Sequence, residues 1–183
     1  MNAAKTDRVT IENVTMAVIP SGSFMMGSDW MPEKGVPETL NALYPDEQPV
    51  HRVEVKAFRL GVVTVTQEQF EAVMGYNPST FKGSDLPVTN TGAGEVEKFL
   101  NGLSRRAGLD PVYHDKTRAA DASKNGFRLP TEAEWEYACR AGTSTRFHTG
   151  DTEADMARAG WYLGNSGRRT HPVGQKEPNA WGL

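Results

Sequence analysis

The stretch GFRLPTEAEWEYACRAG, from Gly126 to Gly142, carries the clearest local signals in the chain. Thr131 and Glu134 have the spacing of a capping box, in which each side chain bonds a backbone N–H of the other residue. Pro130 sets the entry to the helix that follows, and Gly142 suits the left-handed conformation that ends helices. The pattern therefore predicts a short helix over residues 132–140.

The apolar spacing within this helix predicts which side chains enter the core. Trp135, Ala138 and Cys139 lie at positions i, i+3 and i+4, which share one helix face. We therefore expect Trp135 to be a core residue rather than a cofactor platform, and Cys139 to be a buried structural thiol. Arg128 and Glu134 are expected to fix the loop and cap the helix rather than to act in catalysis.

Further helices and strands are predicted outside this stretch. Thr66 and Gln69 form a second capping box before a helix over 67–74, and an apolar stripe that includes Phe99 predicts a helix over 95–106. These elements indicate a mixed α and β domain with many turns. The remaining expected elements are a strand–turn–strand at 16–28, a surface loop at 29–46, a half-buried strand at 51–60 and a short strand at 110–113.

Composition and charge narrow the classes of partner. The formal net charge is −3, so no global positive field attracts a nucleic acid or an anionic membrane. The Arg168–Arg169 pair near His171 is expected to be a solvated loop. No apolar run approaches the roughly 18 residues of a membrane span, and the N-terminus lacks a signal peptide. We therefore expect a soluble, cytoplasmic domain with neither nucleic acid nor membrane as partner.

Four segments of the chain are informative about more than local secondary structure. In order they are VIPSGSFMMGS, DEQPVHRVEVKAFRLGVVTVTQEQF, GFRLPTEAEWEYACRAGT and NSGRRTHPVGQKEPNAWGL. Together they resemble the formylglycine-generating-enzyme, or sulfatase-modifying factor, family. The resemblance implies an α+β, C-type-lectin-like fold with short elements and long loops. It assigns residues 1–13 to an N-terminal extension and 14–183 to the N-terminal two thirds of the family's domain, incomplete at the C-terminus.

The end of the chain supports the same expectation. Trp181 and Leu183 are apolar and follow a Pro178-Asn179 turn directly, whereas a natural C-terminus usually ends in polar residues. This pattern predicts that the chain is a fragment. We expect the fragment to be only marginally stable, because part of the surface against which its apolar helix faces would pack is missing.

The resemblance also implies a cofactor. Family members oxidise a substrate-protein cysteine to formylglycine with O₂ and a copper(I) ion held by two cysteines, which suits a soft metal. Cys139 is the sole cysteine of these residues, so copper is implied only if a C-terminal cysteine pair exists outside them. In some relatives the cysteine that matches Cys139 forms a disulfide near the C-terminus, and here a free thiol is expected.

Structural calcium is a second implication of the resemblance. Asn165 matches an acidic ligand position, and Gly167 matches a position that uses its backbone carbonyl. An asparagine supplies an oxygen without a charge, which weakens a site for a hard cation. The alternative interpretation is a plain Asn-Ser-Gly turn.

The sequence leaves two classes of function open for this chain. The first is a domain of an oxidase that acts on a protein or peptide cysteine, inactive as this fragment. The second is a non-catalytic, lectin-like binding or accessory module. A third, the accessory half of an iron-dependent sulfoxide synthase, is disfavoured because the segment before Val14 is too short for the helical domain of those enzymes. The oligomeric state has no signal in the sequence.

Overall fold

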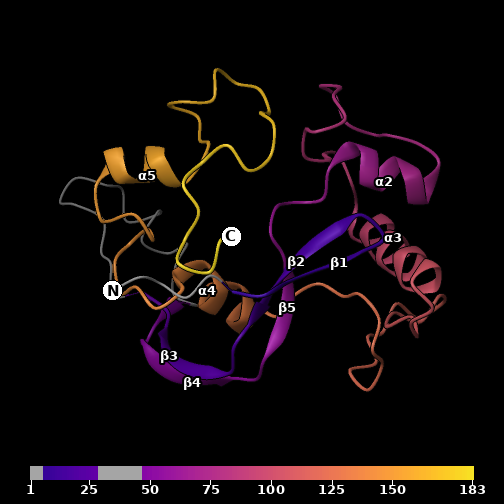
Figure 1. Cartoon of the computed structure of the whole chain (residues 1–183), viewed down its shortest axis with the longest axis horizontal. Helices are drawn as coiled ribbons and strands as arrows, with labels where there is room; N and C mark the ends of the chain where they lie inside the picture. The colour runs from indigo at the N-terminus through magenta and orange to yellow at the C-terminus, as the bar shows by residue number, and fades with distance from the viewer. Residues whose placement is uncertain (1–5, 29–46) are drawn as a thin grey trace.

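The computed structural model describes residues 6–28 and 47–183 (Figure 1). Its helices and strands form a mixed α and β domain, as the sequence predicts. The loop expected at 29–46 lies outside the described residues. The elements, in order, are β1 (Arg8–Ile11), β2 (Val14–Ile19), β3 (Gly22–Met26), β4 (His51–Val55), β5 (Phe58–Gly61), α2 (Gln67–Met74), α3 (Ala93–Arg106), α4 (Glu132–Arg140) and α5 (Glu153–Ala159).

Strands β2 to β5 form one long antiparallel ribbon rather than a hairpin at Pro20. Strand β2 pairs with β5, and β3 pairs with β4. Ile19 faces Phe58 and Gly22 faces Val55, so the register continues unbroken through the bend. The two strands predicted within 16–28 are confirmed, but they do not pair with each other: β2 pairs with β5, and β3 pairs with β4.

The bend also changes which side chains face the core. Val55 is buried, yet Ala57 is exposed, and the inward positions continue at Phe58 and Leu60. The alternation expected for one strand over 51–60 is therefore interrupted between β4 and β5. Side chains alternate between the two faces of a strand. A bend at the same level in both paired strands therefore shifts the positions that face the core by one residue.

Strand β1 lies in the segment that the sequence assigned to an extension. It pairs with β2 through a two-residue turn at Glu12 and Asn13, whose φ angles are 48° and 63°. Positive φ at both turn residues is the type I′ geometry that suits a tight hairpin. The turn contains no glycine, so its sequence carries only a weak turn signal.

The three predicted helices are confirmed, and a fourth, α5, was not foreseen. Capping boxes open α2 and α4 at Thr66 and Thr131, as expected, and α3 begins two residues before the predicted start. Helix α5 opens at Thr152 with an aspartate as its capping partner. The strand expected at 110–113 was wrong, because Tyr113 forms only an isolated bridge with Ala120.

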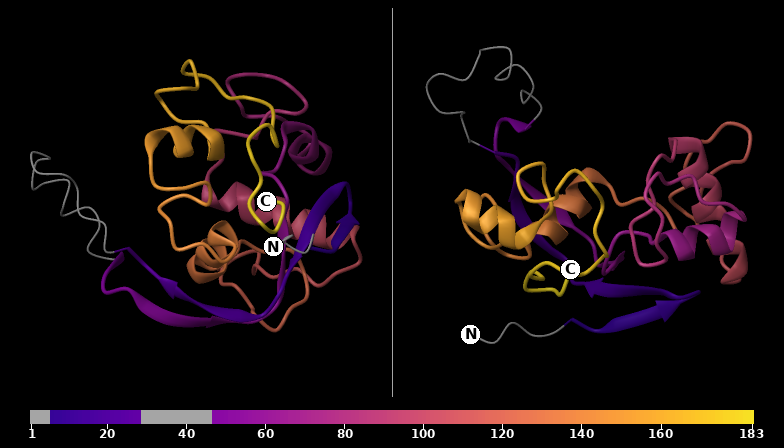
Figure 2. Two further views of the ribbon diagram at one scale, coloured as in Figure 1. Left: turned by 60° about the vertical axis from the view of Figure 1, so that its left-hand side comes forward. Right: turned by 90° about the horizontal axis from the view of Figure 1, so that it is seen from above.

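The core is divided into two apolar clusters. One lies between α4 and the ribbon and contains Ile19, Val55 and Tyr137. The other lies between α2 and α3 and contains Phe70 and Phe99. Figure 2 shows the same division, with α2 and α3 at one end of the molecule and α4 and α5 at the other. The longest described helix, α3, has 14 residues, and none of the described helices has the length and apolarity to cross a bilayer.

Helix α4 presents a different face to the core from the one predicted. Tyr137 and Ala138 are buried, whereas the Trp135 side chain is 58% exposed. The Tyr137 ring packs on Phe24 and Trp181, with centroids 5.4 and 4.8 Å away. The expectation of a core Trp135 was therefore wrong. The inward position goes to Tyr137, whose ring fills the space between the ribbon and the last residues of the chain.

We expect Phe70→Ala to lower the free energy of unfolding by about 3–5 kcal/mol, the usual cost of removing a buried aromatic ring. Phe70 is 1% exposed and stacks on Phe99 at 5.3 Å. The control is Leu163→Ala, at an apolar side chain that is 76% exposed. This control is expected to change stability by less than about 0.5 kcal/mol. Urea unfolding measures both, and equal losses in the two variants would contradict the assigned core.

Candidate binding surface

The first residue of α2, Gln67, organises the loop that follows this helix. Its side chain is buried, with 1% exposure. The Nε2 atom donates to the carbonyl oxygens of Phe81 and Pro87, at 2.8 and 3.2 Å. The Oε1 atom accepts from Asn77 Nδ2 and Gly83 N, at 2.8 and 3.2 Å. All four hydrogen-bonding positions of the amide are satisfied, so the loop is fixed around it while the Phe81 ring stays 39% exposed.

A second loop, over residues 160–171, follows α5 and is held by Asn165 and His171. Asn165 Oδ1 accepts from the Tyr162 backbone N–H at 2.8 Å, and its Nδ2 donates to Gly160 O at 3.0 Å. His171 Nε2 donates to the Ser166 carbonyl at 2.8 Å. These bonds fix the backbone of the second loop without a helix or strand.

Trp161 is the anchored aromatic residue of this second loop. Its ring stacks on His171, with centroids 3.8 Å apart and planes 15° apart. Lys176 Nζ lies 3.7 Å from the indole centroid and donates to Ala157 O at 2.6 Å. Trp161 nevertheless remains 41% exposed, and nearby Leu163 is 76% exposed. The loop therefore presents apolar surface to solvent from a fixed position.

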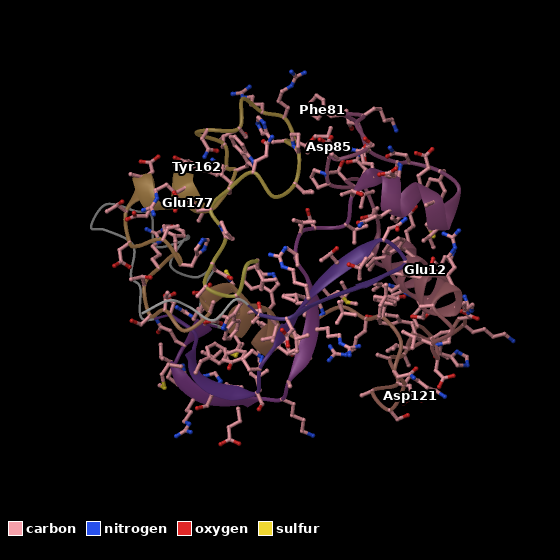
Figure 3. The ribbon with its side chains drawn as sticks, viewed as in Figure 1. Glu12, Phe81, Asp85, Asp121, Tyr162 and Glu177 are labelled. Atoms are coloured by element: carbon pink, nitrogen blue, oxygen red, sulfur yellow. The ribbon has the colours of Figure 1, made fainter. Side chains whose placement is uncertain are left out.

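The two loops meet in space. Val173 N donates to Asp85 O at 3.0 Å, and the Arg169 guanidinium lies 5.5 Å from the centre of the Phe81 ring. Figure 3 shows Phe81 and Asp85 beside the loop that precedes the C-terminus. We define the loop surface as the side chains of Phe81, Trp161, Leu163, Arg168 and Arg169.

The loop surface contains two neighbouring arginines that form no ion pair with the residues described. Arg168 and Arg169 are exposed, and within residues 6–28 and 47–183 neither guanidinium pairs with a carboxylate. Five other arginines do form such pairs: Arg105, Arg118, Arg128, Arg140 and Arg158. The exposure that the sequence predicts for the Arg168–Arg169 pair is confirmed, and the contact of Arg169 with the Phe81 ring is an addition to it.

An open hollow lies beside the first loop. It has a volume of about 610 Å³ and is lined in part by Glu68, Glu71 and Lys82. With two carboxylates and one ammonium, the charged side chains of this hollow are net negative, whereas those of the loop surface are positive.

Arg128 and Glu134 have the structural roles that the sequence predicts. The guanidinium donates to both carboxylate oxygens, at 2.7 and 2.6 Å, and Glu134 Oε2 also accepts from Thr131 N at 2.8 Å. The hydrogen bond from Arg128 lowers the pKa of Glu134, with the Thr131 backbone bond adding to it. The pair therefore joins the preceding loop to the start of α4.

Cys139 does not have the environment of a reactive thiol. The residue is exposed, so the expectation of a buried structural thiol was wrong. Neighbouring atoms still desolvate the sulfur enough to raise the pKa of Cys139, whereas a nucleophilic cysteine needs a lowered pKa. Nor do the described residues bring together three or more His, Cys, Asp or Glu side chains that could hold a metal.

The residues expected to bind calcium lie in the second loop. Asn165 Oδ1 already accepts one backbone N–H, which leaves one lone pair for a cation. Gly167 has a φ of 58°, the left-handed conformation of a tight turn. Calcium binding by Asn165 and Gly167 stays a prediction, and the turn geometry accounts for both residues without a metal.

The Arg128–Glu134 pair should make stability depend on pH. Because the folded pKa of Glu134 lies below its unfolded value of about 4.3, the ionised carboxylate stabilises the domain above that pH. This contribution is lost as the pH falls through the folded pKa. We therefore expect wild type to exceed Glu134→Gln in unfolding free energy at pH 7, with the difference shrinking below about pH 4.

Urea unfolding at a series of pH values measures this difference. Glu132→Gln is the matched control, since Glu132 is exposed in the same helical turn and forms no ion pair among the residues described. A pH-dependent difference as large in the control as in Glu134→Gln would contradict the role assigned to the pair.

Comparison with known proteins identifies the family of this chain and solved structures with a similar fold. The family model described as "Sulfatase-modifying factor enzyme 1-like domain" matches residues 2–183. A solved structure, Treponema denticola variable protein 1, superposes with a TM-score of 0.78 at 31% identity and covers 97% of this chain and 71% of that one. PvdO from Pseudomonas aeruginosa gives a TM-score of 0.70 at 24% identity, over 98% of this chain and 70% of that one, and shows the shared fold.

Curated relatives have diverse names. The chaperone protein LppX of Paenibacillus barcinonensis is 29% identical over 82% of this chain and 65% of its own length. The hercynine oxygenase of Mycolicibacterium smegmatis is 32% identical over 87% and 40%. The formylglycine-generating enzyme of Mycobacterium tuberculosis is 30% identical over 90% and 68%. The chain thus spans between two fifths and about two thirds of the length of these relatives.

Proposed function

Since this chain belongs to the sulfatase-modifying factor enzyme 1-like family, we propose that it forms a lectin-like recognition domain that binds another protein. The loop surface carries this proposal, because it combines fixed, exposed aromatic side chains with two unpaired guanidinium groups. Tryptophan and arginine are the residue types enriched at the energetic centres of protein interfaces. One scaffold serves many functions, and the relatives' names include a chaperone as well as two enzymes.

The residues present do not fit the copper centre that the family implies. A two-cysteine copper(I) site requires two thiolates, and these 183 residues contain one cysteine. Its raised pKa also disfavours the thiolate form. We therefore assign no step of cysteine oxidation to the residues of this chain.

An oxidase role is the second candidate. The similarity to a hercynine oxygenase and a formylglycine-generating enzyme favours it. In that case this chain supplies the scaffold, and protein outside these residues supplies the thiolates. The two candidates differ in what the chain does by itself, so each has a separate test.

Peptide display tests the recognition function. We expect the immobilised chain to enrich peptides from a random phage library, and Trp161→Ser to lose that enrichment because the exposed indole is removed. Trp135→Ser is the matched control, since it removes an exposed tryptophan from α4, outside the loop surface. Thermal melting confirms that both variants are folded. No enrichment by wild type, or equal loss in both variants, would reject the proposal.

Mass spectrometry tests the oxidase role of the chain by itself. We expect a cysteine peptide incubated with this chain, copper and O₂ to show no conversion to the aldehyde, because one thiol cannot form the two-cysteine site. Cys139→Ser is the control. Aldehyde formed by wild type and absent with Cys139→Ser would show that Cys139 is catalytic and would overturn this assignment.

A further inference from the structure

We propose that the loop surface binds an acidic peptide segment, in which carboxylate side chains alternate with apolar ones. The inference rests on the proposed recognition function and names the chemistry of the partner. It depends on three properties of the loop surface: unpaired guanidinium groups, exposed apolar side chains on the same two loops, and a backbone that is fixed before any partner arrives.

The charge of the partner follows from Arg168 and Arg169. The chain as a whole has a net charge of −3, yet these two neighbouring cations lack a carboxylate partner among the residues described. The Arg169 Cζ atom lies over the Phe81 ring, 5.5 Å from its centre. A cation–π contact of this kind uses none of the guanidinium N–H groups as hydrogen-bond donors. Those N–H groups match the two oxygens of a carboxylate, which accepts them in parallel.

The apolar part of the partner follows from Trp161 and Leu163. Trp161 is 41% exposed although His171 and Lys176 hold its ring, and Leu163 is 76% exposed. A rigid indole loses little conformational freedom on binding, which is why pre-organised aromatic side chains make effective anchors. An apolar ligand side chain placed here removes surface of both residues from water.

The two loops are ordered by bonds within the domain. Gln67 fixes the first loop with four hydrogen bonds, Asn165 fixes the second with two, and the Val173–Asp85 bond joins them. The spacing between Arg169 and Phe81 is therefore set before binding. A partner then needs to order only itself, which favours a short extended peptide over a surface that must also reorganise.

A nucleic acid fits the same surface less well. Affinity for nucleic acid depends on the number of phosphates that cations neutralise, and Arg168 and Arg169 are only two. Leu163, which is 76% exposed, offers an aliphatic surface that an apolar peptide side chain covers and a phosphate backbone does not.

Fluorescence polarisation with a labelled peptide of alternating glutamate and leucine tests the inference. We expect saturable binding that weakens with added salt, because the contacts are charged and exposed. Arg169→Glu should weaken binding about tenfold or more, as expected when a central interface arginine is reversed. Arg59→Glu is the matched control, since it makes the same charge change at an exposed arginine of β5, and we expect it to leave binding within about twofold.

Two control peptides separate the parts of the proposal. Replacing glutamate by lysine should abolish binding, and replacing leucine by serine should weaken it about tenfold, as expected when the apolar contact is lost. Equal binding of either control peptide, a tighter interaction with single-stranded DNA of similar length, or equal effects of Arg169→Glu and Arg59→Glu would overturn the inference. Enrichment of peptides without acidic residues in the display experiment would also overturn it while leaving the recognition function intact. The absence of any enriched peptide would remove both.

Discussion

The backbone of Gly27, just after β3, is held at both of its polar groups by two side chains of α4. Glu136 Oε1 accepts from Gly27 N at 3.0 Å, and Arg140 Nη2 donates to Gly27 O at 2.9 Å. Arg140 Nε also donates to Glu136 Oε1 at 2.8 Å, one turn along the helix. Both side chains are partly buried, so screening by water is limited. This clamp joins α4 to the end of β3, beside the apolar cluster in which Tyr137 packs against the ribbon.

Placement of α4 in turn positions the loops at the opposite side of the domain. With α4 fixed, Tyr137 packs between Phe24 and Trp181. Asn179 Nδ2 then donates to the carbonyl oxygens of Ala138 and Cys139 at the end of the helix, at 2.7 and 3.1 Å. These bonds hold the C-terminal segment, which carries Lys176 to the Trp161 ring and Glu177 to Arg158. The second loop is thus supported at its C-terminal end by contacts that begin at the clamp.

Helices α2, α3 and α4 were predictable from sequence because their signals are local, whereas α5, whose capping partner is Asp155 rather than Glu or Gln, was missed. The capping residues Thr131 and Glu134 lie within four positions of each other, and both bonds form as expected. Strand pairing was not predictable, since β3 takes its partner from beyond residues 29–46 and nothing within 16–28 specifies that choice. The face of α4 was mistaken for a related reason. Trp135 and Tyr137 both fit an inward stripe, and only contacts with Phe24 and Trp181 decide between them. Likewise, Arg168 and Arg169 were identified as a basic cluster, while their neighbour Phe81 comes from a loop that only the fold brings close.

The segment that most resembles the family has four of its charged side chains engaged within the domain. Arg128 and Glu134 pair with each other, and Glu136 and Arg140 hold Gly27. A side chain whose hydrogen bonds already maintain the fold has little freedom to take up a ligand, since releasing it leaves a partly buried charge without a partner. The recognition function that we propose therefore relies on side chains that the scaffold leaves unpaired, and loops can change these without disturbing the clamp. A fold whose stabilising residues are separate from its loops can host many functions.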